Sequence, residues 1–349
     1  MVDLERMRAN IDRLQVELDR RGIALRPHAK THKSVRIARL QLEAGARGLT
    51  VGTLGEAEVF AAAGISDLFV AYPIRAEGPK AARLRALHEA APGLRVGADS
   101  VGGVELLGEA VAGADRRLRI LVEVDPGNAR TGVVGGAAVV EVAAAARQAG
   151  LDVGGVFSHG GHAYRPGAAA AAGADEVRAL SEAAAALEAE GFEVAVVSAG
   201  STPTSLTAAT GRVTEIRAGT YVLGDRQQAI LGAIPAAGCA LAVAATVVST
   251  FPDRLVIDAG AKSLTKDRPD WVVGFGAIAG YPELAIERLS DYHGVVAVPS
   301  GAARPALGEV VAVIPNHVCP VVDLFDRLVV VDADGSTDDW PVDARGRSG

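Results

Sequence analysis

The sequence predicts an α/β protein that consists of a (β/α)8 barrel of the TIM type followed by a mainly β domain. Short apolar runs rich in β-branched residues alternate with longer Ala-, Glu- and Arg-rich stretches. Eight such units follow one another, and after about residue 235 the sequence shows little helical periodicity. Eight strand-then-helix units fit a closed barrel better than an open doubly wound sheet. We therefore place the barrel in residues 1–235 and the β domain in residues 236–349.

The apolar runs predict the eight barrel strands, and the stretches between them predict helices. The strands are expected within residues 24–30, 48–53, 67–73, 94–99, 119–125, 153–160, 193–200 and 215–222. Helices are expected within residues 56–64, 79–91, 137–150 and 175–191, and a charged amphipathic helix rather than a signal peptide within residues 1–20. After residue 235, apolar runs separated by turns predict further strands.

The composition excludes several classes of protein. Apolar residues make up 49% of the 349 residues and aromatic residues only 4%, which allows a large core of small aliphatic side chains. The net charge of −7 argues against a surface for nucleic acid or anionic membrane. Two distant cysteines do not suggest a disulfide framework and fit a reducing cytoplasm. The longest apolar run, residues 239–248, is too short to span a bilayer.

Polar residues gather where the predicted barrel strands end, which is where such barrels keep their chemistry. The residues at these ends are His28, Lys30, His32, Asp125, Arg130, His159, His162, Tyr164, Gly200, Ser201, Thr202, Gly219, Thr220 and Tyr221. One histidine at a strand end is more often structural than catalytic. Five clusters on one predicted face indicate a functional site.

The segment SAGSTPT, which ends the seventh strand, predicts a phosphate site. Gly200 lets the backbone approach a ligand, Ser201 and Thr202 supply hydroxyls, and Pro203 stands where a helix would begin. An ordinary capped helix start would have the same residues. The neighbouring Gly219-Thr220-Tyr221 favours phosphate, because the seventh and eighth strands form the usual phosphate site of these barrels.

A lysine at the end of one strand and a phosphate site across the barrel suggest pyridoxal 5′-phosphate. Lys30 would hold the cofactor as a Schiff base, and the phosphate would anchor it. On a strand, Lys30 alternates inward with His28 and His32, whereas Lys33 has the opposite parity and is expected at the solvated surface.

The segment PNHVCP in the second domain suggests a metal site. On a strand, His317 and Cys319 would point to the same side and could touch one divalent ion, with zinc favoured and manganese or magnesium as other candidates. Two protein ligands would leave the ion open to water and substrate. The alternative is a buried cysteine beside a structural histidine.

Several motifs together resemble those of one known family. RPHAKTHK, LGEAE, DPGNARTG, SHGGHAY, SAGSTPT, AGTYVLGD, DAGAKS and PNHVCP occur in this order across almost the whole chain. They look like the D-threonine aldolase and D-serine dehydratase family of fold-type III pyridoxal enzymes, which have an alanine-racemase-like barrel and a C-terminal β domain.

The resemblance implies a role for each motif. It makes Lys30 the carrier of pyridoxal phosphate and places Arg130 near the phenolic oxygen of the cofactor and Tyr164 near its ring. It makes Gly200, Ser201, Thr202, Gly219 and Tyr221 the phosphate cradle, and His317 and Cys319 the metal ligands. It also implies a homodimer that acts on small D-amino acids.

The family further implies a lyase for D-configured β-hydroxy-α-amino acids. We favour a D-threonine aldolase, with His162 or, in its place, His159 as the base, over a D-serine or D-3-hydroxy amino acid dehydratase. The margin is narrow, because His-x-Cys is associated with dehydratases in this family. Two further alternatives are a pyridoxal-phosphate carrier protein, which would not need PNHVCP, and an alanine racemase, which would need Tyr281 or Tyr292 as a base.

Overall fold

The computed structural model describes residues 1–349, which form two compact units that are not consecutive stretches of the chain. One unit, called the barrel unit below, consists of residues 13–30, 37–219 and 346–349. The other, called the β unit, consists of residues 1–12, 31–36 and 220–345. Each unit therefore takes segments from distant parts of the sequence. The composition-based boundary between residues 235 and 236 stays a prediction.

The barrel unit contains one sheet of eight parallel strands in the order β2-β9-β8-β7-β6-β5-β4-β3. A parallel bridge between His28 and Thr50 joins the two ends, so the sheet closes into a barrel as predicted. Each predicted run contains one strand. The strands are β2 (Ala24–Leu25), β3 (Leu49–Val51), β4 (Leu68–Pro73), β5 (Arg95–Ala98), β6 (Arg119–Glu123), β7 (Asp152–Phe157), β8 (Val196–Ala199) and β9 (Glu215–Ile216).

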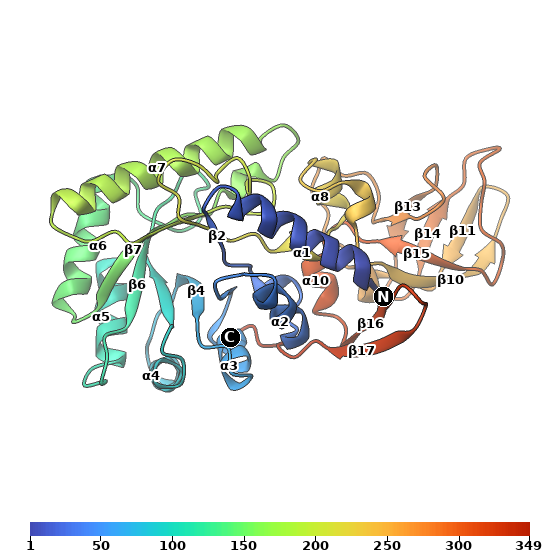
Figure 1. The fold of residues 1–349 in the computed structure, drawn as a ribbon. Helices are drawn as coiled ribbons and strands as arrows, with labels where there is room; N and C mark the ends of the chain where they lie inside the picture. Colours follow the sequence, from blue (N-terminus) through green and yellow to red (C-terminus); the bar gives the residue numbers. More distant parts are fainter. The chain divides into compact units, whose positions relative to one another are not determined.

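Helices follow most of these strands and surround the barrel, as Figure 1 shows. They are α2 (Val35–Glu43), α3 (Leu54–Ala62), α4 (Pro79–Ala90), α5 (Val101–Ala110), α6 (Gly136–Gln148) and α7 (Ala169–Ala189). Helix α3 begins where the Thr53 hydroxyl accepts the backbone N–H of Glu56 at 3.0 Å, which satisfies one of the free N–H groups of the first turn. Helix α7 includes most of the alanine-rich segment that precedes residue 175.

The barrel interior combines an aromatic cluster with a buried ion network. Phe69 and Phe157 pack edge to face with ring centroids 5.0 Å apart, against the buried Leu121. The fully buried guanidinium of Arg26 donates to the buried Glu215 at 2.6 Å and to the partly exposed Asp67 at 2.8 Å. The paired charges satisfy each other in the interior, which an unpaired charge could not do.

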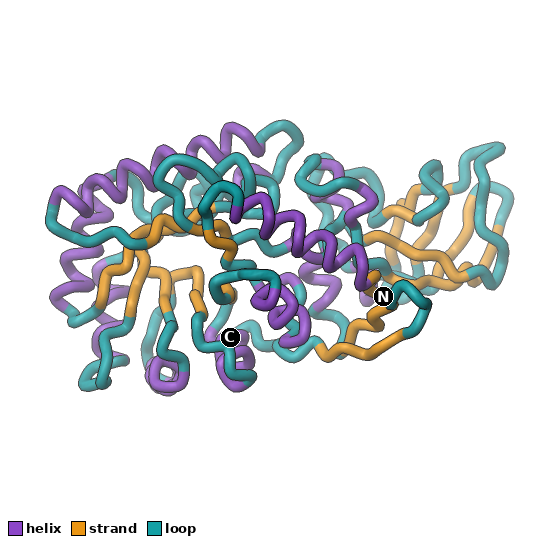
Figure 2. The backbone as a smooth tube through the Cα atoms, in the orientation of Figure 1, coloured by secondary structure: helices purple, strands orange, loops and turns teal.

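The β unit is built from two sheets, whose strands are orange in Figure 2. An antiparallel sheet has the order β12-β15-β10-β11-β14-β13, and a smaller sheet has the order β1-β16-β17. The strands are β1 (Val2–Asp3), β10 (Val243–Thr250), β11 (Arg254–Ile257), β12 (Ala277–Ile278), β13 (Ala285–Leu289), β14 (Gly294–Ala297), β15 (Val310–Ile314), β16 (Arg327–Val331) and β17 (Thr337–Pro341). The expected mainly β domain is confirmed.

Short helices connect the strands of the β unit, and the predicted N-terminal helix is present. The helices are α1 (Leu4–Asp19), α8 (Arg226–Ile230), α9 (Ala261–Leu264) and α10 (Val318–Val322). Single 3₁₀ turns are η1 (Ala29–Thr31), η2 (Gly161–Ala163), η3 (Thr220–Val222) and η4 (Ala236–Gly238). None of the helices combines the length and the apolar character needed to cross a membrane.

Candidate active site

The predicted residues of the barrel unit lie beyond the carboxyl ends of its strands. They follow β2, β6, β7, β8 and β9, and because all eight strands are parallel these ends form one rim. The residues at this rim are Lys30, Arg130, His159, His162, Tyr164, Gly200, Ser201, Thr202 and Gly219.

Lys30 lies in the 3₁₀ turn η1 rather than on a strand, so the predicted strand alternation is wrong. Pro27 has no N–H for a strand ladder, and the barrel wall continues only to His28, whose N–H donates to Ala218 at 2.9 Å. The chain then turns, and the N–H of Lys30 donates to Nδ1 of His28 at 3.4 Å. Lys30 is exposed at the rim, where its amine is accessible to a ligand.

Lys33 is not at the solvated surface, which corrects the prediction. Only 6% of the residue is exposed, and its amine lies 2.8 Å from a carboxylate oxygen of Asp323 in the β unit. Its backbone has a φ of 49°, and its carbonyl accepts the N–H of Ala344. The strand parity failed here because residues 29–34 form a turn, in which side chains do not alternate.

The segment predicted to bind phosphate forms a buried turn with its own hydrogen bonds. Gly200 has a φ of 87°, which favours glycine. The hydroxyl oxygen of Thr204 accepts the N–H of Ser201 at 2.9 Å and lies 3.1 Å from the Ser201 hydroxyl. Ser201 and Thr202 are 3% and 2% exposed, and the Ser201 hydroxyl is held by its contact with Thr204.

No helix begins at Pro203, which is a third correction. Residues 202–212 form turns, because the Thr204 side chain takes the N–H of Ser201 and the N–H of Ser205 returns to the carbonyl of Thr202. Of the other predicted cradle residues, Gly219 follows β9, and Thr220 and Tyr221 are buried in η3 of the β unit.

The two predicted histidine bases differ in their surroundings. Burial, and then the positive charges of Lys30 and Arg130, hold the pKa of His159 well below its usual value, so its imidazole is neutral at physiological pH. His162 lies on η2, with Nε2 3.3 Å from a carboxylate oxygen of Asp175 and with a buried Nδ1 that has no hydrogen-bond partner. The ring of Tyr164 lies 6.4 Å from that of His159.

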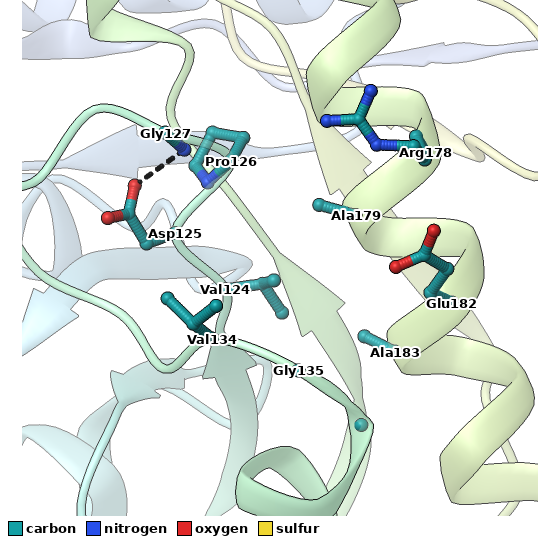
Figure 3. Close-up of a pocket in the computed structure, with 11 residues that line it drawn as sticks. Val124, Asp125, Pro126, Gly127, Val134, Gly135, Arg178, Ala179, Glu182 and Ala183 are labelled. Atoms are coloured by element: carbon teal, nitrogen blue, oxygen red, sulfur yellow. Dashed lines mark hydrogen bonds between the residues drawn. The ribbon is translucent and has the colours of Figure 1, made fainter.

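Arg130 is exposed on a loop that the Asp125 carboxylate organises. This carboxylate accepts the N–H groups of Gly127, Asn128 and Ala129 at 2.7–3.2 Å. On the other side of the loop, a cleft of about 310 Å³ separates it from Arg178 and Glu182 of α7, as Figure 3 shows. Of the polar residues predicted at the strand ends, only Asp125 lines this cleft, and neither the predicted catalytic residues nor the predicted cofactor-binding residues do.

Four buried charged residues of the barrel unit were missed by the sequence analysis. The guanidinium of Arg217 donates to the Ser198 hydroxyl at 2.6 Å and to the Ser158 carbonyl. Its charge is opposed by those of Glu215, Glu176 and Glu123. These residues lie on different strands and on α7, and only the fold brings them together. The arginine in RAGTYV, directly before the predicted phosphate residues, was the one local signal.

The predicted metal ligands lie together, but not on a strand. His317 is the N-cap residue of α10, and Cys319 lies in its first turn, where Pro320 is tolerated. Burial alone would lower the pKa of His317, but its contacts with Cys319 and Asp267 raise it to about 10. Nδ1 of His317 lies 2.5 Å from a carboxylate oxygen of Asp267.

Further contacts hold this segment of the β unit in place. The buried carboxylate of Asp225 accepts the N–H of Val318, which lies between the two predicted ligands, at 3.0 Å. The thiol of Cys319 lies 3.2 Å from the hydroxyl of Thr31, the residue that follows Lys30 in the chain. No group of three or more His, Cys, Asp or Glu side chains is arranged to hold a metal ion. An ion on His317 and Cys319 would therefore be completed by other ligands, as in open sites.

The rim has the groups that pyridoxal phosphate requires. An accessible amine is available on Lys30, ordered hydroxyls on Ser201 and Thr204, and positive charge on Arg217 and Arg130. The buried carboxylate oxygen Oε2 of Glu123 has no hydrogen-bond partner, which is a polar feature expected beside a ligand site. The residues present therefore fit the cofactor.

Two family models match nearly the whole chain. The model of the alanine racemase N-terminal domain matches residues 2–227, and that of a putative serine dehydratase domain matches residues 240–331. D-threo-3-hydroxyaspartate dehydratase of Delftia sp. is 34% identical, with 97% of this chain and 95% of that protein covered. D-threonine aldolase of Arthrobacter sp. is 36% identical, with 100% of this chain and 92% of that protein covered.

Solved structures agree with these matches. The Delftia dehydratase superposes with a TM-score of 0.91 at 33% identity, over 97% of this chain and 95% of that one. A cysteine-to-alanine variant of the same dehydratase is described as a metal-free form. D-threonine aldolase of Filomicrobium marinum gives a TM-score of 0.89 at 30% identity, over 100% and 95% of the two chains.

With an alanine-racemase-like barrel, a C-terminal β domain, and aldolases and dehydratases as full-length relatives, the chain belongs to the D-threonine aldolase and D-3-hydroxyaspartate dehydratase family of fold-type III pyridoxal-phosphate-dependent lyases.

Proposed function

We propose that the protein is a D-threonine aldolase: a lyase that cleaves D-β-hydroxy-α-amino acids, D-threonine among them, into glycine and an aldehyde. The observation that carries the proposal is the place of His159 after β7 at the barrel rim, where its ring lies 6.4 Å from that of Tyr164 and the charge of Lys30 contributes to its lowered pKa. A neutral imidazole can accept a proton at physiological pH, which the retro-aldol reaction requires at the β-hydroxyl. The Arthrobacter aldolase, similar over the whole chain, supports the same reaction.

In the proposed reaction, His159 accepts the β-hydroxyl proton while the Cα–Cβ bond breaks and the aldehyde forms. His162, held by Asp175, is the second candidate for this base. Lys30 would hold pyridoxal phosphate until the substrate's amine takes its place, and the cofactor would then supply the sink for the electron pair left at Cα. Cα then takes a proton, and the product glycine is released. Arg130, Tyr164, the SAGSTPT turn and Gly219-Thr220-Tyr221 would hold the cofactor.

We also propose that His317 and Cys319 bind a divalent ion, which would supply Lewis-acid chemistry toward the substrate hydroxyl. Asp267 would keep the proton of His317 on Nδ1 and leave Nε2 free for the ion. The metal-free form of the Delftia cysteine variant supports a cysteine ligand in that relative. We propose a homodimer as the working assembly, which light scattering can test.

Dehydration of the same substrates is the second candidate. Lys30 would remove the Cα proton and the β-hydroxyl would leave, giving a 2-oxo acid and ammonia after hydrolysis. Cys319 and the similar Delftia dehydratase favour this outcome. A racemase is less well supported, because the Tyr281 hydroxyl donates to Glu309 and Tyr292 is 60% exposed.

Product analysis tests the proposal. The protein loaded with pyridoxal phosphate is incubated with D-threonine, D-serine and D-threo-3-hydroxyaspartate, with each L-enantiomer as control, with and without a chelator. We expect glycine and acetaldehyde from D-threonine, and loss of the activity on chelation. Ammonia and a 2-oxo acid as the main products would establish the dehydratase instead. Activity that is insensitive to the chelator would refute the metal proposal.

A further inference from the structure

Glu176 of helix α7 is a buried carboxylate that contacts two of the turns at the barrel rim. It is 0% exposed. Oε1 accepts the Ser158 hydroxyl at 3.1 Å and the N–H of Gly200 at 3.0 Å, and Oε2 accepts the Thr204 hydroxyl at 2.8 Å. Ser158 follows β7, and Gly200 and Thr204 belong to the turn after β8. One side chain thus joins the turn that leads to His159 to the turn predicted to bind phosphate.

The carboxylate also fixes the direction of the hydrogen bonds inside the phosphate turn. An ionised carboxylate can only accept, so the single hydroxyl proton of Thr204 is directed to Glu176. The Thr204 oxygen is then left as an acceptor for both the N–H and the hydroxyl of Ser201. The chain of bonds from Ser201 through Thr204 to Glu176 has one orientation, and it holds the turn in one shape.

The residues around Glu176 leave room for its carboxylate and balance its charge. A methyl group on Gly160 would lie 2.6 Å from Oε2, so the glycine leaves room for the carboxylate. Arg217 balances its charge electrostatically and donates to the carbonyl of Ser158, whose hydroxyl donates to Glu176. The same network therefore connects Glu176 to the buried cation of the rim.

A negative charge next to a site for an anionic phosphate is unfavourable by itself. The repulsion between the carboxylate and the phosphate must therefore be offset. A turn that the carboxylate already holds in the binding conformation can offset it, because a preorganised site loses less conformational entropy on binding. We propose that Glu176 is a positioning residue that holds the SAGSTPT turn in its phosphate-binding shape before the cofactor arrives. The role concerns the phosphate end of pyridoxal phosphate and does not depend on which reaction follows.

The substitution Glu176→Gln tests this role. The amide has nearly the same shape, but it presents an NH₂ group to one of three donors and cannot keep the bond directions. We expect the dissociation constant of pyridoxal phosphate, measured by fluorescence titration, to rise about tenfold. The inhibition constant of inorganic phosphate against cofactor binding should rise by a similar factor. Binding of pyridoxal, which lacks the phosphate, should not change.

Two further variants give the matched comparison. Glu182→Gln removes a carboxylate from the exposed side of the same helix and should leave all three constants unchanged. Thr204→Val keeps the side-chain shape but breaks the hydrogen-bond chain, and should weaken pyridoxal phosphate and inorganic phosphate as Glu176→Gln does. Thr204→Ser should restore the binding. Thermal unfolding of each variant without cofactor shows whether it is folded.

Other results would overturn the proposal. Tighter binding of pyridoxal phosphate to Glu176→Gln would mean that charge repulsion outweighs positioning. An equal loss for pyridoxal and for pyridoxal phosphate would mean that Glu176 supports the barrel in general. Unchanged binding of all three probes in a folded variant would mean that the turn keeps its shape without the carboxylate.

Discussion

The two cysteines have different environments and should differ in reactivity. Burial, and then the charge of Asp225, raise the pKa of Cys239 to about 11, whereas Cys319 is partly exposed. Because the thiolate is the reactive form, we expect iodoacetamide at pH 8 to modify one thiol per native chain and two in urea. Mass spectrometry of the labelled peptides identifies the site as Cys319.

The same assay tests the proposed metal ligand. Cys319→Ser should remove labelling of the native protein and leave one reactive thiol in urea. Zinc added before the reagent should slow the modification of Cys319 in the wild type, since a metal-bound thiolate is protected. Equal labelling of both cysteines would contradict the predicted difference, and a labelling rate that zinc does not change would argue against Cys319 as a ligand.

His159 should make stability depend on pH in a known direction. Its pKa in the folded protein is well below 6.5, so between these values the unfolded chain binds a proton that the native state does not. Unfolding becomes easier as the pH falls below 6.5, by up to about 1.4 kcal/mol per pH unit. In cofactor-free protein, the unfolding free energy of the wild type minus that of His159→Gln, both from urea unfolding, should therefore fall between pH 7 and pH 5. A constant difference would show that His159 does not titrate in this way.

Residue types could be read from the sequence, but their surroundings could not. The motifs placed Lys30 at the rim, where the structure has it. The argument from alternating side chains on a strand was wrong, because Lys30 lies in a 3₁₀ turn. Lys33 was misplaced because its partner, Asp323, lies 290 residues away. Glu176 was invisible for the same reason, since an alanine-rich helix gives no local indication that one of its carboxylates is buried.

At the scale of elements, the close pairing of β7 with β8 depends on Gly155. Its φ is 142°, and a methyl group there would lie 1.9 Å from the carbonyl oxygen of Val196, its partner in the ladder. Gly155→Ala would push the strands apart, and we expect a loss of about 3 kcal/mol or more, measured by urea unfolding. Gly102→Ala on α5, where nothing lies within 4 Å, should keep or raise stability. A Gly155→Ala protein as stable as the wild type would contradict this packing.

Elements were predictable where the periodicity was local. All eight barrel strands were found, because β-branched runs are separated by helices. The errors fall where turns replace regular structure. The chain leaves the first barrel strand after His28, whose side chain accepts the N–H of Lys30. Thr204 prevents a helix at Pro203, and Pro320 allows α10 to begin within PNHVCP. In each case a proline or a side-chain hydrogen bond decided the geometry, and the strand pattern did not.

At the scale of the whole molecule, cofactor binding should stabilise the folded protein and distinguish its two neighbouring lysines. A ligand that binds only the native state adds about 2.7 kcal/mol to the unfolding free energy at 100 times its dissociation constant. We expect this increment, measured by urea unfolding with and without pyridoxal phosphate, in the wild type. Lys30→Met should lose most of it at the same cofactor concentration, because the covalent attachment is gone.

Lys33→Met is the matched control for this measurement, since it changes the same residue type three positions away. It loses the ion pair with Asp323, so its stability without cofactor should fall below that of the wild type. Its increment from pyridoxal phosphate should nevertheless match that of the wild type. If Lys33→Met lost the increment and Lys30→Met kept it, the assignment of the cofactor lysine would be reversed. Increments as large as that of the wild type in both variants would mean that neither amine contributes to the binding.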